Sequence, residues 1–435
     1  MENFICDNIG VTPEGHLTFA GQDTAELAER YGTPLYLMDE ERVRHNMRVY
    51  RDAMEKYMPA GSGMLYASKA ASFRQIYRIA NEEGCGADVV SSGELATAKA
   101  AGFDMEKAYF HGNNKTDADI RLAMDLGTGY FVVDNAEELA VIDREAALRG
   151  IRQKILLRLT PGIDPHTYAA INTGKVDSKF GTAIETGQAE QLTRYALELQ
   201  HTELCGFHCH VGSQVFAEDV FERSAAVMLE FAAGIRAQTG YTAGVIDLGG
   251  GYGVRYISDD PYLDIADKIR AVSQSIQAAC IRLSMEPPAI LLEPGRSIVA
   301  DAGMTLYTVG AVKRIPGYRN YVTVDGGMAD NPRFALYGAR YTVLPADKMN
   351  EARTMVCTLA GRCCESGDVI QENVRMPEST RRGDLAAVCT TGAYNYSMAS
   401  NYNRLGRPPV VMLNKGESYT AVRRESLEDL LRLDE

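Results

Sequence analysis

Long apolar runs are missing from this sequence. No stretch of about 18 apolar residues occurs in the 435-residue chain, so no membrane-spanning helix is expected. No basic segment offsets the net charge of −13, which argues against a nucleic-acid partner. The opening residues 1–6 lack the basic and apolar regions of a signal peptide, and we expect none.

The cysteines also lack a recognisable pattern. Nine cysteines stand at irregular spacing, which is not typical of a disulfide framework. Cys205 and Cys209 flank an apolar run, and Cys363 and Cys364 are adjacent, but neither pair has the matching histidines of a metal site. We therefore expect no metal and reduced thiols in a cytoplasmic protein, with one of the thiols a candidate catalytic group.

What is present is the composition of an ordinary globular protein, with 46% apolar and 24% charged residues. The length allows two domains, one of them a barrel of roughly 250 residues. Near the start, the pattern predicts a helix over 24–31, with Asp23 as N-cap and Gly32 as its stop. A long helix follows, opened by Asp39 and running to about Tyr57.

From Met64 onward, apolar strand patterns alternate with helical ones. The predicted strands are 64–68, 87–90, 108–111, 130–133, 155–159, 204–210, 245–248 and 290–293. The predicted helices include 92–101, 117–126, 136–148, 187–199, 217–239 and 264–285. Such alternation favours parallel strands with right-handed crossovers, and eight βα units that close on themselves form a TIM barrel. An open, doubly wound sheet is the structural alternative.

Past about residue 297 the pattern changes to strands separated by Gly, Pro and Asp turns. These strands are predicted at 304–314, 321–325, 341–344, 355–361, 385–390 and 409–413, and a short amphipathic helix at 426–433. The pattern is typical of a mainly antiparallel β domain. We expect a barrel over 39–296, and a β-sandwich or barrel-like domain formed by 1–38 together with 297–435.

A single lysine stands at the end of the first predicted barrel strand, in Tyr66-Ala67-Ser68-Lys69-Ala70. A lysine at the end of a buried strand is costly unless its charge is used or its pKa falls. A desolvated lysine amine is nucleophilic and forms a Schiff base with a carbonyl cofactor such as pyridoxal phosphate, PLP. On these residues alone, a lysine that simply extends to water is the alternative.

Other motifs also follow predicted strands, where a TIM barrel carries its active site. The glycine-rich segment 247–253 suits an anion such as phosphate, and Glu293-Pro294-Gly295-Arg296 follows the next strand. In barrels these two neighbouring loops often share a phosphate site. His208 and His210 are interpreted either as a hydrogen-bonded core pair or as groups that stack on a flat ring, with Ser213 a possible phosphate donor.

Ordered motifs along nearly the whole chain resemble the fold-type III PLP-dependent decarboxylases of the alanine racemase-like class, and among these the diaminopimelate decarboxylases. The motifs are 31–34, 66–70, 88–95, 111–115, 173–181, 210–214, 247–253, 293–296, 325–328, 333–337, 364–368 and 392–394. The resemblance implies a PLP-binding TIM (β/α)8 barrel joined to a mainly antiparallel β domain. It also implies a homodimer with shared active sites and a small amino-acid substrate.

The resemblance assigns roles residue by residue. The cofactor-binding positions are Lys69 (the Schiff-base lysine), Asp88, Arg158, His210 (stacked on the pyridine ring), Ser213, Gly249, Gly250, Gly251, Glu293 (facing the pyridine nitrogen), Gly295, Arg296 and Tyr394. The substrate-binding positions are Arg296, Arg333, Tyr337, Glu365 and Tyr394. The catalytic positions are Lys69, His210 and Cys364, and the resemblance implies that Cys364 and Glu365 enter the partner subunit's site.

The chemistry of these residues favours decarboxylation. An acid at Glu293 keeps the ring nitrogen protonated and the ring electron-withdrawing, whereas an arginine there would suit a racemase. Arg296 and Arg333 suit a carboxylate at the far end of the substrate, and Glu365 suits its ammonium. We therefore expect decarboxylation of meso-2,6-diaminopimelate to L-lysine, the last step of lysine biosynthesis.

Two other functions remain open. One is decarboxylation of another basic amino acid, such as ornithine, arginine or a carboxylated polyamine. The other is a PLP-carrying protein without turnover, although a carrier would need neither the β domain nor Cys364. The sequence departs from the family pattern at Ser92, where glycine is usual, and at Tyr168, where a second histidine is frequent.

Overall fold

The computed structural model describes residues 4–163, 177–217 and 219–435, and its chain folds into two compact units. One unit contains 46–253 and 263–297, and the other contains 1–45, 254–262 and 298–435. The first division falls inside helix α2 (Glu40–Tyr57), and the segment 254–262 leaves the first unit to join the second. The domain limits expected from the sequence, 39–296 with its two flanking segments, stay a prediction.

The first unit is a closed barrel of parallel strands. In barrel order these are β5 (Gly63–Ala67), β6 (Gly86–Val89), β7 (Ala108–Phe110), β8 (Tyr130–Val133), β9 (Gln153–Thr160), β11 (Thr202–His208), β12 (Val245–Asp247) and β13 (Ala289–Leu292). Pairing of β13 with β5, through Leu291 opposite Gly63, closes the ring. The predicted eight-stranded TIM barrel is thereby confirmed, and the open doubly wound sheet is excluded.

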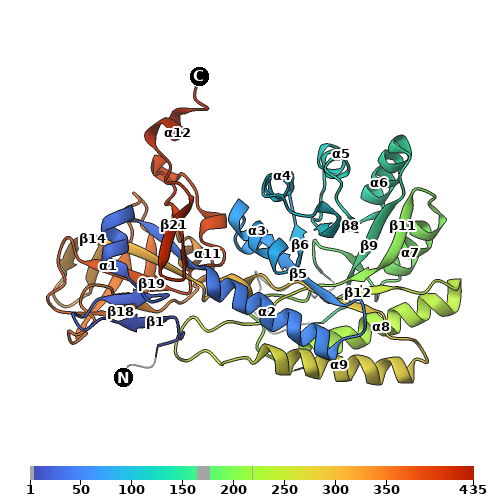
Figure 1. Ribbon diagram of the computed structural model, residues 1–435, viewed down its shortest axis with the longest axis horizontal. Coiled ribbons are helices and arrows are strands. Elements are labelled where there is room, and N and C mark those ends of the chain that lie inside the picture. Colours follow the sequence, from blue (N-terminus) through green and yellow to red (C-terminus); the bar gives the residue numbers. More distant parts are fainter. Residues whose placement is uncertain (1–3, 164–176, 218) are drawn as a thin grey trace. The chain divides into compact units, whose positions relative to one another are not determined.

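Helices follow the barrel strands and lie outside them (Figure 1). They are α3 (Arg74–Glu82), α4 (Ser92–Ala100), α5 (Asp117–Asp125), α6 (Ala136–Arg149), α7 (Gln188–Glu198), α8 (Val220–Thr239), α9 (Ile265–Arg282) and α10 (Arg296–Val299), with the short strand β10 (Thr182–Ala183) pairing to β9. Inside the barrel, Leu65, Tyr109, Val132, Leu156 and Leu291 form a buried cluster. Because side chains fill the barrel interior, polar groups of the strands gather at the strand ends.

The second unit is mainly antiparallel, as predicted. Its strands are β1 (Ile9–Val11), β2 (Leu17–Phe19), β3 (Gln22–Asp23), β4 (Leu35–Asp39), β14 (Gly303–Arg314), β15 (Asn320–Val324), β16 (Val343–Pro345), β17 (Met355–Ala360), β18 (Val369–Met376), β19 (Leu385–Cys389), β20 (Val410–Asn414) and β21 (Glu417–Val422). The first three make a small sheet, and the others make a nine-stranded sheet in which β15–β17 and β4–β20 are parallel pairs.

The helices of the second unit are α1 (Thr24–Tyr31), α11 (Arg333–Tyr337) and α12 (Leu427–Leu431). The α1 boundaries match the prediction because Asp23 caps the helix by accepting a hydrogen bond from the Ala25 N–H, and Gly32 ends it at φ 69°. The strand residues Leu17, Leu35, Met304 and Leu413 pack in the apolar core of this unit.

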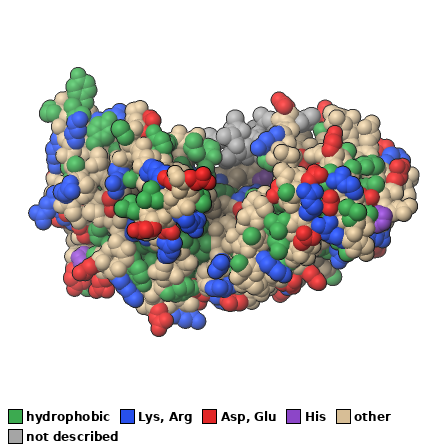
Figure 2. All heavy atoms as spheres, turned by 90° about the horizontal axis from the view of Figure 1, so that it is seen from above, with side chains coloured by type: hydrophobic (Ala, Val, Ile, Leu, Met, Phe, Trp, Pro, Cys, Tyr) green, Lys and Arg blue, Asp and Glu red, His purple; other side chains and the backbone are tan. Residues whose placement is uncertain are grey.

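The surface of the described residues is mixed in charge. On the face shown in Figure 2, acidic and basic side chains alternate without an extended patch of one sign. Among the described residues, no helix has both the length and the apolar character needed to cross a membrane. All nine cysteines are free, as expected from their spacing.

Candidate active site

Charged side chains gather where the barrel strands end. Lys69 lies in the helical turn directly after β5, and its Nζ is 3.8 Å from Oδ2 of Asp88 on β6. His111 follows β7, and its Nε2 is 3.8 Å from Oδ1 of Asp88 and 2.8 Å from Oε1 of Glu293, which follows β13. The side chain of Lys69 is 42% exposed, whereas those of the three other residues are at most 4% exposed. The cluster therefore presents one accessible amine above buried acid and imidazole groups.

His111 and His208 each lie against a different oxygen of the Glu293 carboxylate. His208, the last residue of β11, donates from Nε2 to Oε2 of Glu293 at 3.2 Å, while His111 contacts Oε1. Burial by itself raises the pKa of Glu293, but the adjacent His111 and His208 outweigh burial and hold it well below its usual range. Glu293 is thus kept as a carboxylate inside the protein.

The pKa values of two neighbouring acids, Asp247 and Asp88, are raised rather than lowered. Burial, followed by the charge of Glu293, raises the pKa of Asp247 well above its ordinary value. The pKa of Asp88 is also raised, by burial first, although His111 opposes the shift. His111, His208, Asp247 and Glu293 place one donor atom each within 4.8 Å of one another. This set has the composition of a metal site, but Oε2 of Glu293 already accepts from His208, and Oε1 lies 2.8 Å from Nε2 of His111.

His111 and Asp247 are the site residues that sequence reasoning missed. His111 opens one of the motifs that carried the family resemblance, and Asp247 opens the glycine-rich segment, so both stood next to assigned positions. Their roles depend on the barrel, because β7, β11 and β13 bring His111, His208 and Glu293 together from distant parts of the chain. His208 is indeed a hydrogen-bonded core residue, but its partner is the site acid rather than its neighbour His210.

His210 lies two residues past β11 and is partly buried. Burial, then the charge of Lys69, lowers its pKa well below the ordinary histidine value. A neutral imidazole is therefore present at the strand ends. An uncharged flat ring suits stacking on another ring, as the sequence predicted for this position.

The low pKa of His208 gives a stability prediction. Burial lowers this pKa from 6.5 to about 4, so between these values the unfolded chain binds a proton that the folded chain does not. The contribution of His208 to the free energy of unfolding therefore falls as the pH drops from about 6.5 to about 4. Urea unfolding at several pH values should show a shallower decline for His208→Asn than for the unchanged chain. An exposed imidazole stays in water in both states, so His45→Asn serves as the control, and a decline equal in all three proteins would contradict the assignment.

The glycine-rich loop after β12 is packed too tightly for side chains. A Cβ on Gly250 would lie 2.0 Å from the backbone oxygen of Glu293, and one on Gly251 would lie 2.1 Å from that of Gly212. Gly251 also has φ +124°, a conformation that favours glycine. The loop after β13 is also tightly packed, since a Cβ on Gly295 would lie 2.8 Å from the Ala67 oxygen. Both loops therefore pack closely against neighbouring backbone at the strand ends.

Arg296 and Ser213 are joined beside these loops. Nη2 of Arg296 donates to Oγ of Ser213 at 2.8 Å, and Nε donates to the same oxygen at 3.2 Å. Arg296 is the first residue of α10 and is only 6% exposed. A guanidinium, a hydroxyl and bare glycine backbone form a donor set that suits a phosphate or carboxylate oxygen.

Buried polar contacts support the strand ends. Nζ of Lys115 donates to the Gly112 oxygen at 2.9 Å, to the Val132 oxygen at 2.7 Å and to Oε1 of Glu138 at 2.8 Å, which ties the loop bearing His111 to β8 and α6. The Arg158 guanidinium on β9 lies 4.5 Å from the centre of the Phe180 ring. Arg158 is only 9% exposed, and its predicted place beneath the cofactor stays a prediction.

Five predicted site residues belong to the other compact unit: Arg333, Tyr337, Cys364, Glu365 and Tyr394. Cys364 and Glu365 are exposed, and the Cys364 N–H donates to Oδ1 of Asn403 at 2.6 Å. Asp368, at the end of their motif, accepts hydrogen bonds from the Cys363 and Met328 N–H groups, each at 2.6 Å. Asp368 thus fixes the loop that carries Cys364. Tyr337 ends α11 and is 38% exposed.

Arg333 is buried without an acid partner. It is 8% exposed, and no carboxylate in residues 4–163, 177–217 or 219–435 forms an ion pair with it. Its guanidinium carbon lies 5.3 Å from the ring centre of Tyr256, 5.8 Å from that of Tyr341 and 5.9 Å from that of Tyr394. A buried cation without an anion is costly, so this position is suited to bind an anion from outside the unit. Tyr394 has φ +62°, which is unusual for a residue other than glycine.

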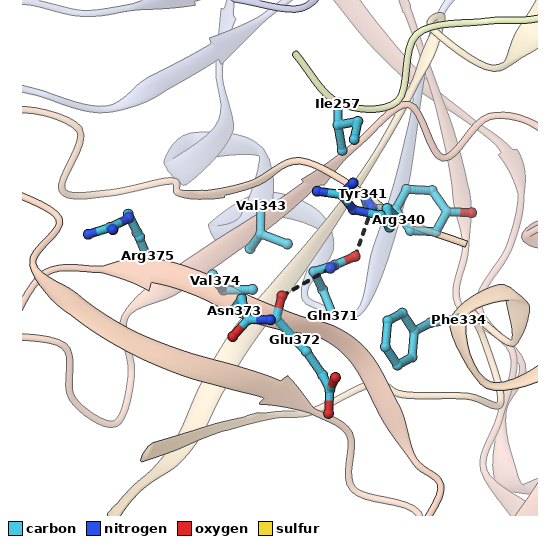
Figure 3. Close-up of a pocket in the computed structure, with 10 residues that line it drawn as sticks. All are labelled: Ile257, Phe334, Arg340, Tyr341, Val343, Gln371, Glu372, Asn373, Val374 and Arg375. Atoms are coloured by element: carbon cyan, nitrogen blue, oxygen red, sulfur yellow. Dashed lines mark hydrogen bonds between the residues drawn. The ribbon is translucent and has the colours of Figure 1, made fainter. Parts of the chain in front are cut away.

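The same unit contains a pocket of about 380 Å³. The residues that line it include Phe334, Arg340, Tyr341, Gln371 and Arg375 (Figure 3). Ser92 and Tyr168 are the two positions at which the sequence departs from the family pattern. Ser92 is the first residue of α4, whose N-cap Ser91 accepts a hydrogen bond from the Glu94 N–H at 3.2 Å, so the helix start is intact. Tyr168 lies outside the described residues.

Comparisons with known proteins show which family this chain resembles. The family described as "Pyridoxal-dependent decarboxylase, pyridoxal binding domain" matches residues 40–300. A diaminopimelate decarboxylase of Bacillus subtilis is 43% identical over 422 residues, which is 97% of this chain and 95% of that protein. A crystal structure of diaminopimelate decarboxylase from M. jannaschii in complex with L-lysine has a TM-score of 0.90 and 33% identity, covering 99% of this chain and 98% of its own. The lysine/ornithine decarboxylase from Vibrio vulnificus complexed with cadaverine has a TM-score of 0.76 and 25% identity, covering 90% of this chain and 98% of its own.

Proposed function

Because the chain belongs to the diaminopimelate decarboxylase family of pyridoxal-dependent decarboxylases, we propose that it converts meso-2,6-diaminopimelate to L-lysine and CO₂. This reaction is the last step of lysine biosynthesis. The observation that carries the choice of substrate is the buried Arg333, which has no acid partner among the described residues. A substrate whose far end bears a carboxylate supplies that anion, whereas the far end of ornithine does not.

The enzyme uses pyridoxal 5'-phosphate, and the residues at the strand ends fit this cofactor. Lys69 presents an accessible amine for covalent attachment to the cofactor's carbonyl carbon. Bare backbone at Gly250 and Gly251, with the Ser213 hydroxyl and the Arg296 guanidinium, suits the phosphate. The neutral ring of His210 suits stacking on the pyridine ring, and Asp88 and Arg158 lie among the groups beneath it.

Glu293 is the acid proposed to face the pyridine nitrogen. When bound, the cofactor supplies a ring that accepts the electron pair left by loss of CO₂. Glu293 remains a carboxylate because His111 and His208 lie against its two oxygens, so it would hold a proton on the ring nitrogen. Asp247 cannot share this task while Glu293 is ionised, since the pKa of Asp247 is raised well above its ordinary value by burial and by Glu293.

The remaining groups are assigned to the substrate and to proton transfer. Arg296 and Arg333 bind the carboxylate of the distal amino-acid head, and the acid Glu365 binds its ammonium. Tyr337 and Tyr394 are proposed to contact the substrate, with Tyr394 also near the cofactor. Cys364 is the proposed donor of the proton that replaces CO₂, and its exposed side chain leaves it accessible for this step.

A substrate panel tests the proposed function. The purified protein, supplied with pyridoxal phosphate, should release CO₂ from meso-diaminopimelate and yield L-lysine. Ornithine and arginine should react far more slowly, because neither places a carboxylate near Arg333. Preferred turnover of ornithine or arginine would support the alternative function, a decarboxylase of another basic amino acid. Measuring the chirality of the lysine also shows which end of the meso substrate reacts.

We further propose that the enzyme works in the cytoplasm as a homodimer whose active sites are shared. Cys364 and Glu365 would then enter the site that contains the partner subunit's Lys69. Such an arrangement is compatible with a two-fold interface, which creates two equal sites. It is supported by the exposed loop that carries Cys364, because a group that serves another chain must be accessible in its own.

Complementation checks the shared site. Lys69→Ala and Cys364→Ala chains should each be nearly inactive, and a mixed dimer should contain one site with both lesions and one site with neither. Under random exchange about half of the dimers are mixed, so activity should return to roughly a quarter of the unmutated level. Mass spectrometry of differently tagged chains verifies that exchange occurs. Absence of recovered activity after verified exchange would show that Cys364 serves the site of its own chain.

A further inference from the structure

Arg333 is oriented by a tyrosine hydroxyl rather than by an acid. Its Nη1 donates to the Tyr341 hydroxyl at 2.7 Å, and its guanidinium forms no other hydrogen bond within the described part of the chain. Arginine has five N–H donors and no acceptor, so the direction of this bond is certain. The bond to Tyr341 uses one N–H group of Arg333 and leaves the others to bind an external anion. It also fixes the orientation of the guanidinium.

The Tyr341 hydroxyl has a second partner. Because it accepts from Arg333, its single proton is available to Oδ1 of Asn395, which lies 3.3 Å away. Asn395 is completely buried and directly follows Tyr394 in sequence. The hydroxyl therefore connects the arginine to the segment that carries another proposed substrate-binding residue.

Tyr341 is itself held by a hydrogen bond from outside its own segment. Its backbone N–H donates to Oε1 of Gln371 on β18 at 2.8 Å, and Nε2 of Gln371 donates to the Glu372 oxygen at 3.0 Å (Figure 3). The ring also packs edge-to-face on Tyr256, with centres 5.4 Å apart. Tyr341 is only 3% exposed although it borders a pocket of about 380 Å³, so these contacts add to the packing that holds its ring.

Building on the proposed function, we propose that Tyr341, assisted by Asn395, is a positioning residue that aims the Arg333 guanidinium at the carboxylate of the distal amino-acid head. The hydroxyl would thereby set the preference for a ligand whose far end is an amino acid over one whose far end is a bare amine. L-Lysine retains this carboxylate and cadaverine lacks it, so the pair isolates the contribution of the carboxylate contact.

The test is competitive inhibition of the full-length enzyme, loaded with its cofactor, by L-lysine and by cadaverine. Tyr341→Phe keeps the ring on Tyr256 and Arg333 but removes the hydroxyl. We expect the inhibition constant for L-lysine to rise about tenfold, because the variant weakens the contact between Arg333 and the ligand carboxylate. The constant for cadaverine should change less than about twofold, because cadaverine has no carboxylate. The KM for diaminopimelate should rise by a similar factor at nearly constant kcat, since the contact is made equally before and during reaction.

Tyr31→Phe is the matched control. In the same unit, the Tyr31 hydroxyl lies 3.0 Å from the backbone oxygen of Ser418 and 2.9 Å from its Oγ, so this variant also loses tyrosine hydrogen bonds but none to Arg333. Its ratio of inhibition constants should equal that of the unmutated enzyme. If Tyr341→Phe does not fold, Asn395→Ser removes the other end of the link and is judged by the same ratio, with a smaller expected change of about threefold.

The outcomes separate the two claims. A folded Tyr341→Phe enzyme with an unchanged ratio, or with both inhibition constants raised equally, overturns the positioning role. An unmutated enzyme that does not decarboxylate diaminopimelate, or that binds cadaverine as well as L-lysine, overturns the proposed function on which the inference rests. A selective loss of L-lysine binding, absent from the Tyr31→Phe control, supports the positioning role.

Discussion

Lys69→Ala should lower the decarboxylation rate by a factor on the order of 10⁴ and remove the absorbance band of the lysine-bound cofactor. Lys69 is the accessible amine at the strand ends, 42% exposed beside the buried Asp88. Without it, the protein has no group at this place to hold the cofactor covalently or to exchange it for the substrate amine. Visible absorbance and CO₂ release measure the two losses separately.

Borohydride reduction locates the attachment directly. In the unmutated protein it should fix the cofactor's mass on the peptide that contains Lys69. Lys99, an exposed residue near the end of α4, provides the control, and Lys99→Ala should keep both the absorbance and the activity. An unchanged absorbance band in Lys69→Ala would show that another lysine carries the cofactor.

Glu293→Gln should retain the cofactor but lose roughly a hundredfold in turnover, because removal of one preorganised electrostatic contact typically costs about 3 kcal/mol of transition-state stabilisation. The amide is nearly the same size but cannot hold a proton on the ring nitrogen. Steady-state kinetics and cofactor absorbance distinguish lost turnover from lost cofactor. Turnover equal to that of the unmutated enzyme would contradict the proposed role.

Glu293→Asp is the matched comparison, since it shortens the side chain but keeps the charge. We expect its loss of turnover to be smaller than that of Glu293→Gln. Asp247 adds a second check, because the charge of Glu293 is one cause of its raised pKa. If Asp247 ionises once that charge is removed, the double variant Glu293→Gln, Asp247→Asn should be slower than Glu293→Gln alone.

Strands β18 and β21 were not predicted from the sequence. β18 (Val369–Met376) contains Gln371, Glu372, Asn373 and Arg375, and β21 (Glu417–Val422) has no buried residue. Neither has a continuous apolar run, and pairing with β17 and β20 makes them strands. The missed β18 carries Gln371, so the contact that holds Tyr341 was also beyond prediction.

The site residues were found through motifs rather than through periodicity. Lys69, Glu293 and Arg296 each follow a predicted strand, and the barrel brings these strand ends together, so their grouping was predictable once the barrel was inferred. The partners of Glu293 were not. Whether His111 or His210 contacts Glu293 depends on the side-chain orientation and on the stagger of the barrel strands, and the sequence specifies neither.

The sequence by itself determined the barrel, the antiparallel β domain and the positions of the chemical groups along the chain. Apolar runs of strand length, helical periodicity and turn residues are local properties, and each is set by a few neighbouring residues. Tertiary structure decided which groups are charged and which groups they bind. Glu293 stays ionised while Asp247 and Asp88 have raised pKa values, although all three are buried acids. The difference arises because His111 and His208 lie against Glu293, and only the closed barrel places them there.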